Sequence, residues 1–304
     1  MFRKTKTFFI RVLCVFGLLS VLAALGIEGY SFYAHETLNT AKLKNFEIYQ
    51  DLQLVKNAQT ITSLKFKQKP LKEMVLLLHS FSTSPEDFKK ILKILDKKGI
   101  AYHAPRILGF GLTDTDLLES IEGEDWVRNV VEQYDMCESL ADKVHVVGQS
   151  FGANLATILA SRRKVEKLVL LSPILFFKGD ALRLQQKAER PAIKFFAEKV
   201  LRYIDLHPES RSIFRYESLP IRSLLALTRI QEMAKQSLSR SRGSKVYVLY
   251  GQFDQIANYE QTFEHFTSKG FAHESHAYRA PHSLFIESSD CQGIILKKIE
   301  EIFS

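Results

Sequence analysis

Short apolar runs alternate along this chain with longer segments in which apolar residues recur every three or four positions. The runs predict buried β-strands and the longer segments predict helices. The predicted strands lie at or near Met74–Leu78, Ile100–Tyr102, Val144–Val147, Leu168–Leu171, Val246–Tyr250 and Ser275–Tyr278. Strands and helices that alternate in this way are typical of βαβ units, so the pattern predicts an α/β fold with a mostly parallel central sheet flanked by helices.

Three of the longer segments predict helices that cover this sheet, at residues 85–98, about 124–140 and about 292–303. The first of them carries Phe88, Ile91, Leu92 and Leu95 on one face, which is the spacing of a helix with one buried side. A loop is expected from Pro105 to Glu122.

The segment from Ile174 to Gly243 breaks the alternation. It contains two helical patterns, Ile193-Phe196-Val200-Ile204 and Leu224-Leu225-Leu227-Ile230, and no convincing strand. We expect a helical cap, inserted after a core strand and lying over the carboxyl ends of the strands, where open α/β sheets bind their ligands. Its aromatic residues either line a pocket or pack the cap onto the core, and they include Phe176, Phe177, Phe195 and Phe196.

Residues 1–34 form a targeting or anchoring segment. Four basic residues, up to Arg11, precede an apolar run from Val12 to Ile27. The run fits a signal cleaved near Ala24-Leu25-Gly26, or an anchor that begins near Phe8 to reach the roughly 20 residues that a bilayer requires. We favour the retained anchor. The basic residues predict that the rest of the chain lies outside the cytoplasm.

Composition limits the remaining possibilities. A chain of 304 residues, 46% of them hydrophobic, can bury one large core, so residues 35–304 are expected to form one domain that includes the insertion at about 174–243. Only three cysteines are present, and one of them lies in the leader. This number indicates neither a disulfide framework nor a thiolate metal site.

The net charge of +8 is concentrated in two places. The leader carries four basic residues and no acidic one up to Arg11, and the insertion carries 14 Lys and Arg against 7 Asp and Glu. A basic insertion is consistent with contact to anionic lipid headgroups, and equally with a solvated helical face. Nucleic-acid binding is not expected, because no recognised motif accompanies these residues. The oligomeric state stays open.

The clearest chemical signal is Gly148-Gln149-Ser150-Phe151-Gly152. It follows the apolar run Val144–Val147 and precedes a helical pattern of small residues, and strand, Gly-x-Ser-x-Gly and helix together are typical of a nucleophile elbow. Such a sharp turn lifts the serine hydroxyl clear of the sheet, and the glycines let helix and strand approach closely. Ser150 is therefore the predicted nucleophile.

A serine hydroxyl needs a base to remove its proton, and the base needs an orienting carboxylate. Elbow enzymes place them in the chain order Ser, acid, His. Asp254 and His282 each follow a predicted late strand, so the predicted triad is Ser150, Asp254 and His282. The rival histidines, His273 and His276, fall in or before a strand. The rival acids, Glu287 and Asp290, come after His282 and so break the expected chain order.

Two backbone N–H groups are predicted to stabilise the oxyanion of an acyl-transfer reaction. The elbow implies the Phe151 N–H, and the loop after the strand at 74–78 supplies the second, which we assign to Phe81. His79 in that loop is expected to be structural, with its imidazole hydrogen-bonded to the loop.

Together these motifs resemble the α/β-hydrolase superfamily, and more narrowly its bacterial carboxylesterase and monoacylglycerol lipase branch, from about Lys72 to the C-terminus. The motifs are Leu78-His79-Ser80-Phe81, Ser84-Pro85-Glu86-Asp87-Phe88, Pro105-Arg106, Gly109-Phe110-Gly111, Asp125-Trp126, the Gly148–Gly152 elbow, Tyr250-Gly251 with Asp254, and His282. Tyr216-Glu217-Ser218-Leu219-Pro220 and the Leu-rich segment after it resemble the cap of that branch. Two positions depart from the family pattern: Ser80 replaces a usual Gly, and Phe110 replaces the His of a Gly-His-Gly loop.

The resemblance implies a serine esterase that acts without a cofactor on short or medium acyl esters or monoglycerides. Two other functions fit the same residues. One is a catalytically silent hydrolase-like module that binds a lipid or protein at the envelope, and the other is an acyltransferase that passes the acyl group to an acceptor other than water. The sequence leaves the acyl length, the headgroup and the physiological substrate open.

Overall fold

The computed structural model describes residues 58–63, 71–112, 116–191, 203–205, 218–240, 243–285 and 291–304. Contacts divide the chain into two units, 1–52 and 53–304, and every described residue belongs to the second. The predicted leader therefore lies outside the described residues, as do Phe195, Phe196, Glu287 and Asp290. No helix in the described ranges combines the length and the apolar character needed to cross a membrane.

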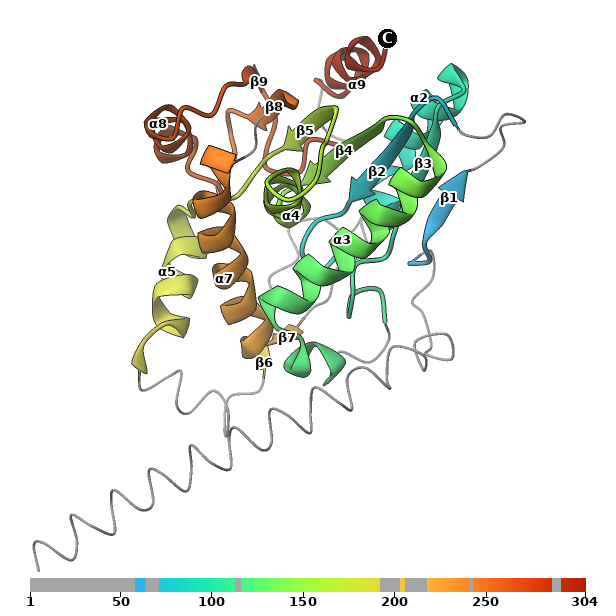
Figure 1. The fold of residues 1–304 in the computed structure, drawn as a ribbon. Coiled ribbons are helices and arrows are strands. Elements are labelled where there is room, and N and C mark those ends of the chain that lie inside the picture. The colour runs from blue at the N-terminus through green and yellow to red at the C-terminus, as the bar shows by residue number, and fades with distance from the viewer. Residues whose placement is uncertain are drawn as a thin grey trace, which may run out of the picture. The chain divides into compact units, whose positions relative to one another are not determined.

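A seven-stranded sheet confirms the predicted α/β fold (Figure 1). Its order is β1-β3-β2-β4-β5-β8-β9, and all neighbours pair in parallel except β1 with β3. The strands are β1 (Ile61–Ser63), β2 (Met74–Leu78), β3 (Ala101–Ala104), β4 (Val144–Gln149), β5 (Lys167–Leu171), β8 (Lys245–Gly251) and β9 (Glu274–Tyr278). The six predicted strands are all present. The added antiparallel strand, β1, was not predicted, because three residues are too short to display a period.

Helices cover both faces of this sheet. They are α2 (Lys89–Lys98), α3 (Gly123–Leu140), α4 (Phe151–Ala160), α8 (Tyr259–Ser268) and α9 (Gln292–Ile302). Two refinements concern predicted boundaries: the helix expected at 85–98 begins as a 3-10 turn, Pro85–Phe88, capped by Ser84, and the expected loop at 105–122 contains the 3-10 turn Asp116–Ser120.

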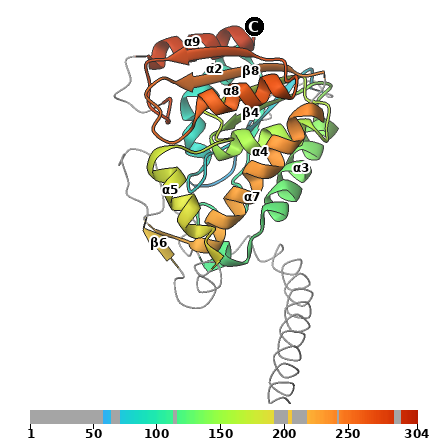
Figure 2. The same cartoon turned by 90° about the vertical axis from the view of Figure 1, so that its left-hand side faces the viewer.

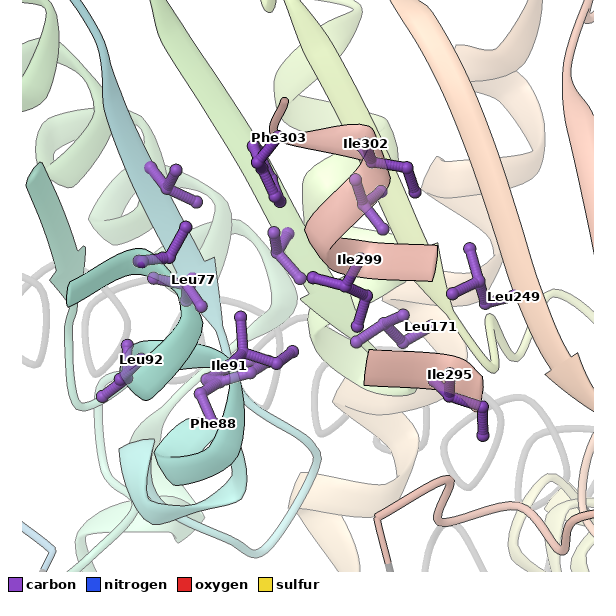
Figure 3. Packing of buried hydrophobic residues seen from close by; sticks show 14 of the residues in the cluster. Leu77, Phe88, Ile91, Leu92, Leu171, Leu249, Ile295, Ile299, Ile302 and Phe303 are labelled. Carbon is purple, nitrogen blue, oxygen red and sulfur yellow. The ribbon is translucent and has the colours of Figure 1, made fainter. Parts of the chain in front are cut away.

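One large apolar core lies between α2, α9 and the sheet (Figure 3). Ile91 from α2 and Ile299 from α9 meet Leu77 and Leu171 from the strands, and all four side chains are fully buried. Burial of each such side chain contributes about 1.5–3 kcal/mol. The closing helix α9 is therefore an integral part of the fold.

The segment between β5 and β8 contains two described helices, α5 (Gly179–Ala188) and α7 (Ile221–Ser237). Figure 2 shows α7 running beside α4, against which it packs. The same segment also contains an antiparallel pair, β6 (Tyr203–Asp205) with β7 (Ser218–Pro220), so the expectation that it holds no strand was wrong. Ile204, the last residue of a predicted helical pattern, instead pairs with Leu219, and a partner so far along the chain leaves no local signal.

A shared carbonyl joins this insertion to α4. The side-chain amides of Asn154 on α4 and Gln231 on α7 both donate to the Ile174 carbonyl oxygen, at 3.1 and 2.7 Å. Because all three residues are buried, these hydrogen bonds hold the start of the insertion against α4, the helix that follows Ser150.

Candidate active site

The site lies at the carboxyl edge of the sheet, where β2 and β4 run side by side. Leu78, the last residue of β2, pairs with Gly148 of β4, so the chain leaves both strands at the same edge. The chain order also reverses there, because β3 lies on one side of β2 and all later strands of the sheet lie on the other. Such a switch point is where open α/β sheets bind ligands.

Ser150 occupies the turn between β4 and α4 in a strained conformation. Its φ is 55° and its ψ is −113°, values that cost a residue with a Cβ about 1–3 kcal/mol. Gly152, two residues later, lets α4 approach β2 closely, since a Cβ at this position would lie 1.9 Å from the Leu78 carbonyl oxygen. This backbone agrees with the predicted elbow and holds the hydroxyl above the sheet edge.

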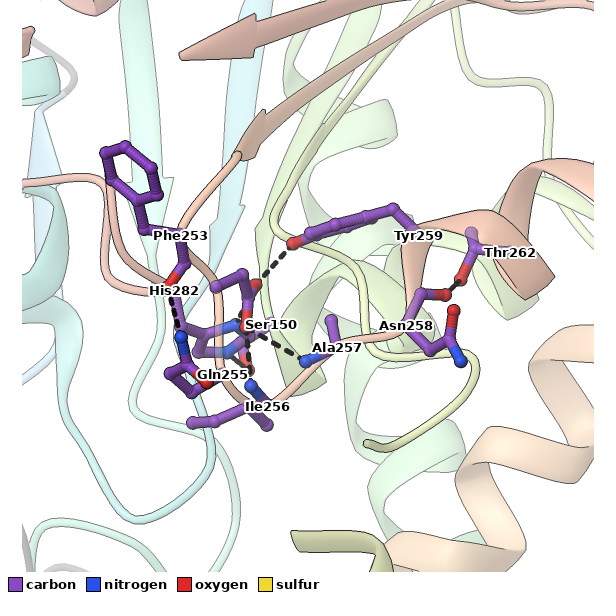
Figure 4. A network of polar contacts seen from close by, with 10 residues as sticks. Ser150, Phe253, Gln255, Ile256, Ala257, Asn258, Tyr259, Thr262 and His282 are labelled. Carbon is purple, nitrogen blue, oxygen red and sulfur yellow. Dashed lines mark hydrogen bonds and ion pairs between the residues drawn. The ribbon is translucent and has the colours of Figure 1, made fainter. Parts of the chain in front are cut away.

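The structure brings the three predicted triad residues together (Figure 4). Ser150 Oγ lies 2.8 Å from His282 Nε2, and His282 Nδ1 lies 2.6 Å from Asp254 Oδ2. Because Nδ1 faces a carboxylate, it carries the imidazole proton, which leaves Nε2 as the acceptor for the serine hydroxyl. Asp254 follows β8 and His282 follows β9, so the carboxyl ends of β4, β8 and β9 supply the set.

Four donors surround the Asp254 carboxylate. Oδ1 accepts from the backbone N–H groups of Ile256 and Ala257, at 2.7 and 2.9 Å, while Oδ2 accepts from His282 and from the Tyr259 hydroxyl, each at 2.6 Å. Burial opposes ionisation, but the hydrogen bonds outweigh it and hold the pKa of Asp254 below its ordinary value. The acid is therefore ionised and fixed in orientation.

The two predicted oxyanion donors lie on adjacent turns. Phe151 is the first residue of α4 and Phe81 follows β2, and their rings contact edge to face with centroids 5.6 Å apart. Within the described part of the chain, neither N–H donates a hydrogen bond to a protein acceptor. Both groups are thus free to bind an oxygen of a substrate.

His79 and Asp87 hold the loop that carries Phe81. His79 Nδ1 donates to the Ser80 carbonyl oxygen at 2.8 Å, and its Nε2 accepts from the Ile107 N–H at 2.9 Å. Asp87 Oδ2 accepts from the Ser80 N–H at 3.0 Å and from the Thr83 hydroxyl at 2.6 Å. These contacts agree with the structural role expected of His79.

The first departure from the family pattern causes no backbone strain at its own position. Ser80 is not among the residues with positive φ, whereas Ser82, two residues later, has a φ of 61°. The conformation that favours glycine therefore occurs at Ser82, and the loop accommodates the serine at position 80.

The second departure fills the space behind both oxyanion candidates with aromatic rings. Phe110 is fully buried, stacks on Trp126 at 5.6 Å, and meets Phe81 and Phe151 edge to face at 5.2 and 6.0 Å. Edge-to-face and offset-stacked pairs of this kind contribute about 0.5–1.5 kcal/mol each beyond area burial. The ring that replaces the usual histidine thus packs the two predicted oxyanion turns together.

The rival histidines have structural contacts. His273 Nδ1 lies 2.9 Å from the Phe271 carbonyl oxygen, and His276 Nε2 lies 2.6 Å from Glu274 on the same strand. Phe177 is buried at the start of the insertion, and Phe176, beside it, packs against other side chains of the insertion and α8. No described group of three or more His, Cys, Asp or Glu side chains has the arrangement of a metal site.

Two further residues of the site were not predicted. Asp87 is part of a predicted motif, but its hydrogen bond to the Ser80 N–H depends on a turn whose shape the sequence does not display. Tyr259 is the first residue of α8, a helix that was not predicted, and nothing in the local pattern singles it out from the other tyrosines.

We predict that His79 makes folding stability sensitive to acid. Burial lowers the pKa of His79 from 6.5 to about 4. Between these two pH values, His79 is protonated in the unfolded chain and neutral in the folded chain. The stabilisation is complete above pH 6.5 and is lost as the pH falls to about 4, with a loss of about 2 kcal/mol by pH 5. Urea unfolding between pH 4 and pH 8 measures it.

The matched variant is His79→Gln, which keeps a polar side chain that does not titrate. Its free energy of unfolding should fall less steeply between pH 6.5 and pH 4 than that of the wild type. Parallel curves for the two proteins would show that His79 does not cause the acid sensitivity.

Comparison with known proteins agrees with this geometry. The model of the alpha/beta hydrolase family matches residues 75–279, which is more than half of the chain. This chain belongs to the alpha/beta hydrolase family. The matched span contains β2 apart from Met74, the elbow and Asp254, and it ends three residues before His282.

Two curated relatives are bacterial enzymes named for ester hydrolysis. The chain is 27% identical to the thermostable monoacylglycerol lipase of Bacillus sp. (strain H-257) over 173 residues, which cover 55% of this chain and 64% of that lipase. It is 22% identical to a carboxylesterase of Bacillus subtilis (strain 168) over 205 residues, which cover 66% of this chain and 80% of the esterase. The match therefore spans less than two thirds of the lipase's own length.

Solved structures share the fold. A metagenome-derived lipolytic enzyme superposes with a TM-score of 0.69 at 17% identity, covering 82% of this chain and 98% of its own. The monoacylglycerol lipase of Paleococcus ferrophilus superposes with a TM-score of 0.62 at 17% identity, covering 78% and 97%.

Proposed function

We propose that this chain is a serine hydrolase that cleaves carboxylic esters through an acyl-enzyme on Ser150. The observation that carries the proposal is the continuous hydrogen-bonded path from Ser150 Oγ through His282 to Asp254. Binding alone would require neither a strained serine nor an acid that accepts four hydrogen bonds. A catalytically silent module is therefore the weaker interpretation.

In the proposed reaction, His282 Nε2 takes the proton of the Ser150 hydroxyl as the oxygen attacks the ester carbonyl carbon. The N–H groups of Phe81 and Phe151 stabilise the oxyanion, and each such donor is worth about 3 kcal/mol in the transition state. Protonated His282 then passes its proton to the departing alcohol. A water molecule, activated by the same imidazole, releases the acid and restores the serine.

The proposed substrates are short or medium acyl esters and monoacylglycerol-like lipids. The names of the relatives support this class, since one is a monoacylglycerol lipase and the other is a carboxylesterase. The half-buried Phe81 places an apolar ring at the oxyanion turn, consistent with an acyl group beside it.

A panel of p-nitrophenyl esters and monoacylglycerols graded by chain length tests this proposal. Wild-type protein should hydrolyse short and medium esters, and Ser150→Ala should hydrolyse none of them above background. Equal rates for the two proteins, or no turnover by the wild type across the panel, would contradict it. Addition of alcohol acceptors distinguishes hydrolysis from acyl transfer, because a transferase would yield new esters in place of free acid.

We also propose that residues 1–34 anchor the protein in the cytoplasmic membrane with the catalytic domain outside the cytoplasm. The basic residues before the apolar run support this orientation, and export after signal cleavage is the alternative. N-terminal sequencing of protein from the membrane fraction tests it: a sequence starting at Met1 or Phe2 supports the anchor, and one starting after Gly26 supports cleavage.

A further inference from the structure

The Tyr259 hydroxyl occupies a special position in the triad. It donates to Asp254 Oδ2 at 2.6 Å, and this is the same oxygen that accepts from His282 Nδ1 at the same distance. The other oxygen, Oδ1, already accepts from two backbone N–H groups. The carboxylate would thus keep its orientation without the tyrosine, and the tyrosine acts mainly on the oxygen that faces the imidazole.

The Tyr259 ring is itself held in place. It lies 4.6 Å from the Tyr250 ring on β8 and 6.2 Å from the Phe263 ring one turn along α8, and the residue is nine-tenths buried. Asn258 caps the helix by accepting from the Gln261 N–H. The hydroxyl is therefore aimed by a helix start and an aromatic cluster, not by a mobile side chain.

The Tyr259 hydroxyl stays protonated and uncharged over the pH range in which the proposed reaction runs. Burial and the neighbouring Asp254 carboxylate hold the pKa of Tyr259 well above its ordinary value, so the hydroxyl remains a donor. Among the described residues, the titratable side chains that face this hydroxyl and its carboxylate are His282 and Tyr250.

We propose that Tyr259 is a positioning residue that withdraws negative charge from Asp254 Oδ2 and so sets the pH range over which His282 accepts the Ser150 proton. A carboxylate oxygen with a second donor attracts the imidazolium less strongly. Tyr259 therefore lowers the pH at which the imidazole becomes protonated, and the base stays available in more acidic solution. This inference rests on the proposed function.

The test compares wild type with Tyr259→Phe, which keeps the ring and removes only the hydroxyl. The acidic limb of the kcat/KM profile for a p-nitrophenyl ester should move to higher pH by about half a unit or more, while the rate on the alkaline plateau changes little. Loss of packing alone would lower kcat/KM on the alkaline plateau or lower the melting temperature, and the pH of the acidic limb would not change. An unmoved or downward-shifted limb overturns the inference.

A matched control is Tyr134→Phe, which removes a buried tyrosine hydroxyl that donates to the Lys164 carbonyl oxygen, before the amino end of β5. The acidic limb of the kcat/KM profile of this variant should coincide with that of the wild type. A second readout needs no turnover: ¹⁵N NMR of histidine-labelled protein follows the titration of the His282 ring. An upward midpoint shift in Tyr259→Phe supports the inference even if ester hydrolysis fails, and an unchanged midpoint refutes it even if hydrolysis is found.

Discussion

Replacement of Ser150 with Ala lowers kcat for ester hydrolysis by about 10⁵–10⁶-fold in our account, because it removes the hydroxyl that contacts His282 Nε2 and forms the proposed acyl-enzyme. Ser150 Oγ is the atom 2.8 Å from that nitrogen, and the residual rate should reflect only binding and the oxyanion turns. Steady-state kinetics on one p-nitrophenyl ester measures the loss.

The fold should survive this substitution, which makes the loss interpretable. The alanine side chain would keep the strained φ of 55°, so the free energy of unfolding should stay within about 1 kcal/mol of the wild-type value. Ser150→Gly is the matched control for strain, because glycine adopts this φ freely and should be more stable by about 1 kcal/mol while equally inactive. An active Ser150→Gly variant would contradict the proposed role of the hydroxyl.

Replacement of Asp254 with Asn should lower kcat by about 10⁴-fold without unfolding the protein. Ile256 and Ala257 donate backbone N–H groups to Oδ1, so the asparagine would turn its carbonyl oxygen toward them and its NH₂ toward His282 Nδ1. Nδ1 must then accept, which moves the imidazole proton to Nε2. The base would face Ser150 with a proton already in place and could not remove another.

The tautomer of His282 can be measured separately. In Asp254→Asn, the activity should recover in part at high pH, where hydroxide replaces the base, and ¹⁵N NMR should report the proton of His282 on Nε2 in place of Nδ1. The matched control is Asp96→Asn, which changes an exposed carboxylate that accepts from the Tyr102 hydroxyl and lies outside the triad. Full activity in Asp254→Asn would show that the acid does not orient the base.

Local sequence patterns predicted the sheet and the site to an unequal degree. The strands β2, β4, β5 and β8 are buried along nearly their whole length, and continuous apolar runs reveal such strands directly. The elbow was equally predictable, because the close approach of α4 to β2 requires glycine at position 152, and this glycine is part of a recognisable sequence motif.

The features that were missed depend on partners far along the chain. β1 pairs with β3 across about forty residues, and β6 pairs with β7 inside a segment that reads as helical. Helix α8 has only three buried residues in ten, so its apolar period is faint. Tyr259 matters because of one hydrogen bond to Asp254, and a hydrogen bond of this kind has no periodic signature.

In the proposed reaction, His282 makes the Ser150 hydroxyl nucleophilic. The most direct measurement is peptide mass spectrometry of the folded protein after treatment with an alkyl fluorophosphonate. We predict a single adduct, on the Ser150 hydroxyl, that is absent from Ser150→Ala and forms far more slowly in His282→Ala. An adduct on another residue, or ester hydrolysis by a protein whose Ser150 stays unmodified, would contradict the account.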